Sequence, residues 1–209
     1  MASNIYEFDP ETHIGKVNGV IWPSVTQLLN KYGMINYDAV PLDVLENKSI
    51  LGTRVQAATV LLDNNNLDED DLKLRFPECV PYVEAYRKFR ICESFELKEK
   101  EVRLFSNKLK FHGSPDEFGT RGFNGKIINV VIDYKCTFHM YKSCGAQLAG
   151  YDMLIEENYG IKAKERWGLL LKPSGNYELT QFKDKSDYTD FRACLYLYWQ
   201  SANKYKTIK

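Results

Sequence analysis

The sequence predicts a mixed α/β fold in which a largely antiparallel or mixed β-sheet lies between helices. Apolar residues recur at helical spacing through most of the first 97 residues. After residue 98 the pattern changes to short runs typical of strands. A small-residue-rich helix, a hairpin and a last helix follow, and this order indicates helices packed on one sheet.

The N-terminal part begins with a short strand and a helix in residues 18–33. Ser24 is the expected N-cap of this helix and Gly33 its expected stop. Residues 41–67 have helical spacing on both sides of Gly52. They predict either one long helix or two helices that meet at this glycine.

The polar run NNNLDEDDL, residues 64–72, predicts a surface loop that caps the next element. Residues 77–95 predict a further helix. Its apolar face is expected to hold Tyr82, Ala85, Phe89 and Cys92.

Three strands are expected next, in residues 99–106, 109–119 and 126–137. The Gly-rich segment TRGFNG, residues 120–125, is expected to be the turn that joins the last two. The rest of the chain predicts three further elements, a helix in 141–160, a hairpin around PSGN in 166–182 and a closing helix in 184–206.

Composition is that of an ordinary globular protein, with 44% hydrophobic and 27% charged residues. No apolar run approaches the roughly 20 residues that span a bilayer. The N-terminus lacks the basic-then-apolar plan of a signal peptide, so we expect a cytoplasmic protein with no membrane partner. The five cysteines form no C-x-x-C pair and indicate neither a zinc ribbon nor a disulfide framework.

Charge is balanced, with 28 basic and 28 acidic side chains. Net charge therefore does not steer the chain towards nucleic acid, and a polyanion would need a local positive groove. Arg121, Lys126 and Lys142 flank the candidate site in sequence and are the expected contributors to such a groove.

The apolar run IINVVI ends in Asp133 and Lys135. Residues two apart on a strand share a face, so both side chains are expected on one side of the sheet. If the preceding strand pairs with this one, Asp116 can lie beside Asp133, and two adjacent carboxylates repel unless a cation sits between them. Alternatively, Asp133 and Lys135 form a surface ion pair at a frayed strand end.

These segments resemble the PD-(D/E)xK nuclease superfamily, specifically its RecB-like and phage exonuclease-like branch. GSPD ends in Asp116, VIDYK contains Asp133 and Lys135, and QLAGY runs from Gln147 to Tyr151. Upstream, GVIWPSVT and GTRVQ resemble two further segments common in that branch, so the likeness covers about residues 17 to 155. The resemblance implies a restriction-endonuclease-like core in a single domain over residues 1–209. Within it we expect a mainly helical part (1–97), a catalytic sheet with its central helix (98–183) and a C-terminal helix (184–209).

The resemblance also implies the site. Asp116, Asp133 and the Tyr134 carbonyl are expected to bind Mg²⁺ or Mn²⁺, with Glu101 as a candidate outer carboxylate. Lys135, Gln147 and Tyr151 complete the implied catalytic set. Gln56 stands where many members have a histidine that helps to bind the metal, and an amide is a poorer ligand. Cysteines are not spaced for an Fe–S cluster, so none is expected.

The function implied is metal-dependent hydrolysis of DNA phosphodiester bonds by a phage- or prophage-type exonuclease of recombination or repair, in a bacterial or phage-infected cell. A single-strand annealing or recombination protein is a candidate partner. The first alternative is a weakly active or inactive nuclease fold that binds DNA or protein, which Gln56 and the neutral charge favour. The second is an unrelated α/β domain with coincidental motifs. His112 is expected on the surface, His13 has no partner pattern, and Cys144 is expected to pack on the sheet.

Overall fold

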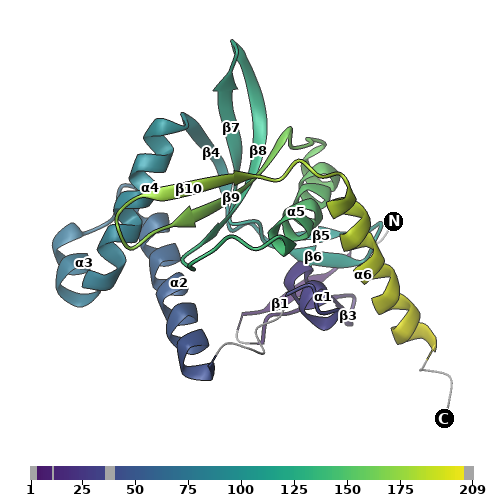
Figure 1. Ribbon diagram of the computed structural model, residues 1–209. Coiled ribbons are helices and arrows are strands. Elements are labelled where there is room, and N and C mark those ends of the chain that lie inside the picture. The colour runs from purple at the N-terminus through teal and green to yellow at the C-terminus, as the bar shows by residue number, and fades with distance from the viewer. Residues whose placement is uncertain (1–3, 11, 36–40, 205–209) are drawn as a thin grey trace.

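A computed structural model describes residues 4–10, 12–35 and 41–204 (Figure 1). Its central sheet has five strands in the order β10-β9-β8-β7-β4. β8 and β9 run parallel, and every other neighbouring pair is antiparallel. The bounds are β4 Phe95–Lys100, β7 Glu117–Phe123, β8 Lys126–Lys135, β9 Glu165–Leu171 and β10 Tyr177–Gln181.

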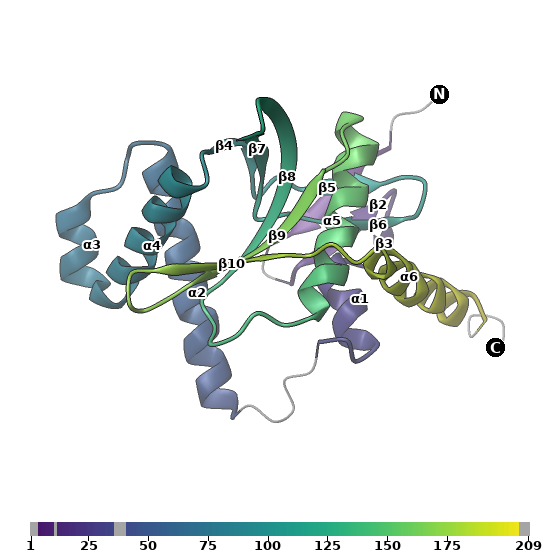
Figure 2. The same cartoon turned by 45° about the horizontal axis from the view of Figure 1, so that its top comes forward.

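Helices cover both faces of this sheet (Figures 1 and 2). α2 and α4 pack on one face, and α5 packs on the other with α1 and α6 behind it. A central mixed sheet flanked by helices was predicted, and this fold class is confirmed. The helix bounds are α1 Val25–Lys31, α2 Leu42–Asp63, α3 Glu69–Arg75, α4 Val80–Cys92, α5 Ser143–Tyr159 and α6 Ser186–Lys204.

Strand β8 divides the two cores because its side chains alternate between the two faces of the sheet. Val130 and Ile132 join the core under α2 and α4. Val131 joins the core under α5, on the side to which Asp133 and Lys135 also point. The apolar residues of β8 therefore anchor both cores and fix the strand that carries the two charged residues.

Two small sheets lie beside α1. One is an antiparallel meander of β1 Tyr6–Asp9, β2 Ile14–Val17 and β3 Val20–Trp22, and the other pairs β5 Leu104–Ser106 with β6 Phe111–Gly113. Sequence patterns predicted only the last strand of the meander, because β1 and β2 are only four residues each and β1 is mostly exposed.

The expected strand 109–119 is wrong, since it is broken into β6 and β7. Pro115 lies in the break, where its missing N–H and fixed φ interrupt a ladder. The expected turn 120–125 is also wrong. β7 continues to Phe123, and only Asn124 and Gly125 form the connection, with φ of 49° and 72°.

The expected strand 99–106 is likewise divided. β4 ends at Lys100, and Glu101 has a φ of 54° that takes it out of the sheet. Arg103 lies in the connection to β5, the separate strand that pairs with β6.

Residues 64–72 are not a loop throughout, because α3 begins at Glu69. Asp68 is its N-cap and accepts hydrogen bonds from the backbone N–H of Asp70 and Asp71, both at 3.0 Å. The acidic residues that indicated a loop instead stabilise the first turn of a helix. Cys92, expected on the apolar face of α4, is exposed at the end of that helix.

Several expectations about single elements are confirmed. Residues 42–63 form one helix that passes through Gly52. Ser24 caps α1, and its hydroxyl accepts a hydrogen bond from the Gln27 N–H at 3.2 Å. The hairpin β9–β10 and helix α6 are present where expected, although residues 205 and 206 of the predicted last helix lie outside the described residues. No helix in the described ranges is long and apolar enough to cross a membrane.

Candidate active site

The predicted catalytic residues meet in one cleft of about 560 Å³. Asp116 comes from the break between β6 and β7, and Asp133 and Lys135 come from the end of β8. Gln147 and Tyr151 come from α5, where a spacing of four puts them on one face. The structure therefore brings these five predicted residues together from three parts of the chain.

Asp133 is the centre of the contacts in this cleft. Its side chain is 1% exposed, and Lys135 Nζ lies 3.0 Å from Oδ1 and 2.8 Å from Oδ2. Gln147 Nε2 donates to Oδ1 at 2.8 Å and lies 3.1 Å from the Tyr151 hydroxyl. The Cys144 thiol, expected to pack on the sheet, donates to Oδ2 at 3.4 Å. The carboxylate is thus held by donors from both β8 and α5.

Asp116 lies beside this group and is tied to the same strand. Its Oδ2 accepts a hydrogen bond from the backbone N–H of Tyr134 at 2.8 Å. Burial, and then the negative charge of Asp133, raise the pKa of Asp116 to about 8. Burial opposes the charged form of Lys135, but Asp133 and Asp116 together raise its pKa above the ordinary value. In this cleft Lys135 is in direct contact with Asp133 and lies close enough to Asp116 for the charge of each to shift the pKa of the other.

Gly113, the first residue of the GSPD segment, is required by close packing. A Cβ atom at this position would lie 3.0 Å from the Tyr151 ring and 3.0 Å from Val25. Such a distance is tighter than ordinary van der Waals contact. The glycine lets the chain that leads to Asp116 approach α5 closely.

Divalent metal ions fit the donor set, which consists of hard oxygen atoms. Asp133 is close enough to Asp116 for its charge to raise the pKa of Asp116, and the Tyr134 backbone N–H donates to the Asp116 carboxylate. Within the described residues, no group of three or more His, Cys, Asp or Glu side chains is arranged to hold a metal. Mg²⁺ accepts such a sparse set because it keeps several waters and takes further oxygens from substrate phosphates.

Gln56 and Glu101 differ in their placement. Gln56 lines the cleft from α2, as the resemblance implies. Glu101 has an exposed side chain and is not among the residues that line the cleft. Its backbone N–H donates to the Asp116 carbonyl at 3.0 Å, so it supports the chain at Asp116. Its role as an outer carboxylate stays a prediction.

The three predicted DNA-contacting residues lie outside the cleft lining. Arg121 and Lys126 lie at the opposite end of β7 and β8 from Asp133, near the turn that joins the strands. The Arg121 guanidinium donates two hydrogen bonds to Glu165, both at 3.0 Å, so its charge is already paired. Lys142 is exposed just before α5.

Several polar residues of the cleft were missed by sequence reasoning: His13, Thr26, Gln27, Arg103 and Ser114. Arg103 lies over the Phe8 ring, 3.6 Å from its centroid, and burial lowers its pKa while the nearby Tyr151 opposes this. It makes no ion pair with a described residue. Its position depends on the turn after β4, which no sequence pattern indicated.

His112, expected on the surface, is fully buried. Its ring packs between Phe8 and Phe105, with centroid distances of 6.0 and 5.4 Å. Burial lowers its pKa to about 4, so the ring is neutral near pH 7. The expectation failed because β6 pairs with β5 and also bridges Ser24, which covers both sides of this short strand.

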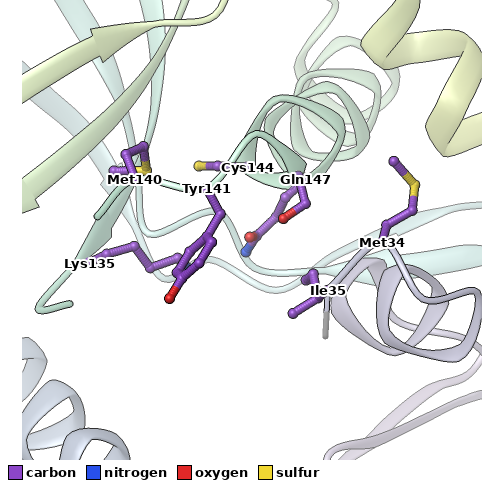
Figure 3. A pocket seen from close by; sticks show the side chains of 8 residues that line it. Met34, Ile35, Lys135, Met140, Tyr141, Cys144 and Gln147 are labelled. Carbon is purple, nitrogen blue, oxygen red and sulfur yellow. The ribbon is translucent and has the colours of Figure 1, made fainter. Parts of the chain in front are cut away.

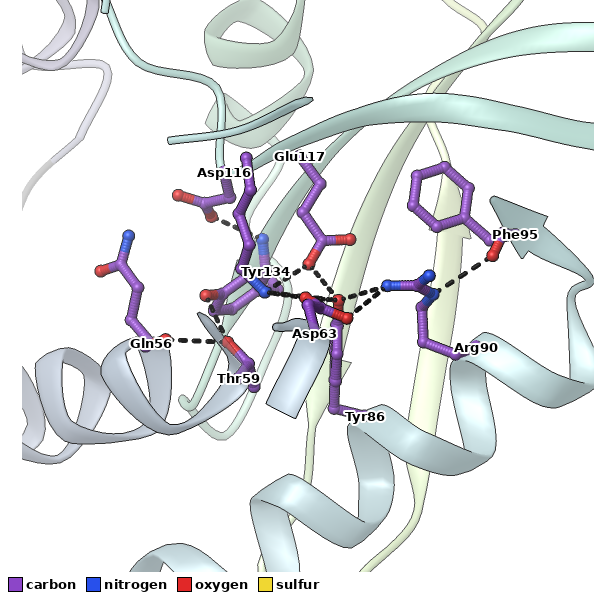
Figure 4. A network of polar contacts seen from close by, with 10 residues as sticks. Gln56, Thr59, Asp63, Tyr86, Arg90, Phe95, Asp116, Glu117 and Tyr134 are labelled. Atoms are coloured by element: carbon purple, nitrogen blue, oxygen red, sulfur yellow. Dashed lines mark hydrogen bonds and ion pairs between the residues drawn. The ribbon is translucent and has the colours of Figure 1, made fainter. Parts of the chain in front are cut away.

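A second group of buried charges lies on the other face of the sheet, under α2 and α4 (Figure 4). It contains Asp63, Tyr86, Arg90, Lys100 and Glu117, and we call it the sealed network. Glu117 Oε1 lies 3.1 Å from Lys100 Nζ and 2.6 Å from the Tyr86 hydroxyl. Asp63 lies 2.7 Å from Lys100 Nζ and 2.6 Å from Arg90 Nη1. Two carboxylates therefore meet two cations.

Comparisons with known proteins found no matching family model and no matching curated protein. Among solved structures, a presumed exonuclease from Eubacterium rectale is 12% identical with a TM-score of 0.46, covering 74% of this chain. An alkaline exonuclease from Laribacter hongkongensis in complex with dAMP is 11% identical with a TM-score of 0.43, covering 88% of each chain. The chain spans 65% of the Eubacterium rectale protein.

Proposed function

We propose that this protein is a divalent-metal-dependent nuclease that hydrolyses phosphodiester bonds in DNA and acts as an exonuclease. The observation that carries the proposal is the convergence of Asp116, Asp133 and Lys135 in one cleft, where Asp133 is paired with Lys135 and Asp116 makes no ion pair with a described residue. An unpaired carboxyl group beside a paired one suits a site that takes a cation.

Asp116, Asp133 and the Tyr134 carbonyl would hold the metal. When bound, Mg²⁺ or Mn²⁺ would act as a Lewis acid towards a phosphate oxygen and lower the pKa of a bound water. Lys135 Nζ, 2.8 Å from Asp133, would orient the attacking water and balance negative charge that grows on the phosphate. Gln147 holds Asp133 in place from α5 and so acts as a positioning residue.

Arg103 supports a polyanionic substrate. Its guanidinium lines the cleft without a carboxylate partner in the described part of the chain. Neutral polar residues such as Thr26, Gln27 and Ser114 also line the cleft. A local positive group of this kind is what a chain with zero net charge needs to bind a phosphate backbone.

The recombination or repair role, the phage-type origin and the pairing with a single-strand annealing or recombination protein are further parts of this proposal. They rest on the motif resemblance. A cytoplasmic location follows from the same proposal.

A second candidate function is a weakly active or inactive nuclease fold that binds DNA or protein. The observation in its favour is Gln56, which occupies the cleft wall where many members of the superfamily have a histidine. Asp116, Asp133 and Lys135 argue against it, because a binding module would gain nothing from keeping buried charges that oppose folding.

The deciding experiment incubates the protein with linear and covalently closed circular DNA in Mg²⁺, Mn²⁺ or EDTA. We expect metal-dependent loss of linear DNA that disappears in Lys135→Ala, with the circle left intact. Cutting of the circle would assign an endonuclease. DNA binding without cleavage in either metal would overturn the enzyme and favour the binding module.

A further inference from the structure

A second, smaller pocket opens beside the cleft and shares two of its wall residues, Lys135 and Gln147 (Figure 3). Its volume is about 50 Å³. The remaining lining comes from the residues after α1, from the loop between β8 and α5 and from the first turn of α5: Met34, Ile35, Met140, Tyr141, Ser143 and Cys144.

Most of this wall is apolar. Met34, Ile35 and Met140 are partly buried and pack on the core under α5. Tyr141 is 49% exposed, and its ring has no aromatic or cationic partner in the part of the chain that the structure describes. Figure 3 shows the Tyr141 ring beside the Lys135 side chain, with its hydroxyl directed away from α5. The pocket thus has one free aromatic face next to one ammonium.

The charge and the size of this pocket together limit the kind of ligand that it can bind. Lys135 is the only charged residue among the described residues of the lining, which suits a neutral group that is joined to an anion. The pocket is too small to enclose a large ring system, so the group must be flat and lie against the Tyr141 face. A nucleotide meets these requirements, because its phosphate can reach Lys135 while its base covers the tyrosine.

We propose that this pocket binds the base of the nucleotide next to the scissile phosphate, by stacking on Tyr141. The inference rests on the proposed nuclease function and specifies its substrate. A base inside a duplex has both faces covered by its neighbours, so the base on Tyr141 is a terminal or unpaired one. Stacking uses the face of a base, which every base has, so this site accepts all four bases.

A neighbouring aromatic residue extends this surface. Phe138 is 74% exposed on the same loop, and Lys48 Nζ from α2 lies 4.7 Å from its ring centroid. An exposed aromatic ring with an adjacent ammonium suits the next nucleotide of the same strand. The loop between β8 and α5 therefore offers two aromatic rings in succession beside the cleft.

The test combines a protein change with a DNA change. The two proteins compared are Asp116→Asn, which prevents cleavage, and the double variant Asp116→Asn/Tyr141→Ala. Each is titrated with a series of oligonucleotides, and each oligonucleotide carries one abasic nucleotide at a different position near one end. We expect one position at which loss of the base weakens binding roughly 5- to 100-fold with Tyr141 and has little effect in Tyr141→Ala. Tyr141→Phe keeps the ring and is expected to bind as the parent does.

Tyr196→Ala is the matched control, since Tyr196 is 64% exposed on α6, away from the pocket. Thermal unfolding of each variant shows whether it is folded. If abasic positions weaken binding equally with and without Tyr141, the pocket does not bind a base, even when the unsubstituted enzyme cleaves DNA. If that enzyme cleaves nothing while the base effect depends on Tyr141, the nuclease proposal fails and the base site stands.

Discussion

Strands β7 and β8 carry acidic groups on both faces, and the two clusters differ in their balance. In the sealed network, Asp63 and Glu117 contact Lys100 and Arg90. In the cleft, Asp133 pairs with Lys135, whereas Asp116 makes no ion pair with a described residue. A cluster with matched charges stabilises a fold, whereas one with an unmatched acid is suited to binding a cation.

The lysine residues of the two clusters also differ in their exposure to solvent. Glu117 is fully buried and the Lys100 side chain is only 9% exposed. Lys135 is 31% exposed and lies at the cleft wall. Substitutions in the two clusters should therefore separate stability from activity.

The largest effect is expected from Lys100→Met in the sealed network. It leaves two buried carboxylates with Arg90 alone, and breaking a buried ion pair in this way costs about 3–5 kcal/mol. Urea unfolding would measure the loss of free energy of unfolding, and cleavage per folded molecule should stay within about twofold. Lys98→Met, at an exposed lysine of the same strand, is the control and should change neither quantity. A large loss of cleavage by folded Lys100→Met would show that the sealed network also serves the chemistry.

The opposite result is expected from Asp116→Asn. Cleavage should fall by at least about 100-fold, as for the loss of one preorganised group in an active site. The free energy of unfolding in EDTA should not fall, because an amide keeps the acceptor for the Tyr134 N–H and removes the repulsion with Asp133. Steady-state cleavage assays and urea unfolding of the same preparation would test this, and a clear loss of stability would contradict the assignment of Asp116 as an unmatched acid.

Metal binding should stabilise the chain through the cleft alone. At a metal concentration about 100 times the Kd, a site that binds only the folded state adds about 2.7 kcal/mol. Thermal unfolding with Mg²⁺ or Mn²⁺ should show a rise in Tm that EDTA reverses. An equal rise in Asp116→Asn would place the metal elsewhere.

The smallest effect is the one that pH is expected to have on the free energy of unfolding in the absence of metal. The pKa of Asp116 is raised to about 8 in the folded chain, above its ordinary value of 3.8, so the folded state binds a proton more tightly. The stability that this proton contributes is present at low pH and is lost as pH rises towards 8, by less than about 1.4 kcal/mol per pH unit. Urea unfolding in EDTA at pH 6, 7 and 8 should show this slope relative to Asp116→Asn. If the free energy of unfolding depends on pH in the same way in both proteins, Asp116 does not have a raised pKa.

Strand and helix periodicity predicted the central sheet and the helices that flank it, because those elements have long apolar patterns. The motif spacing likewise predicted that Asp116, Asp133, Lys135, Gln147 and Tyr151 belong together. Arg103 and His13 could not be predicted, since both reach the cleft through short connections with positive φ nearby. Nor could the sealed network, whose residues are scattered over four elements and meet only after the sheet pairs.

Tyr134 and helix α2 connect the two clusters. The Tyr134 N–H holds Asp116, while its ring lies on the other face and its hydroxyl is 3.1 Å from the Thr59 hydroxyl. On α2, Gln56 lines the cleft, and Asp63, four residues after Thr59, belongs to the sealed network (Figure 4). Any change in the register of this helix would move a cleft residue and a network residue by the same step. A substitution that shifts α2 to suit one cluster would therefore also displace a residue of the other cluster.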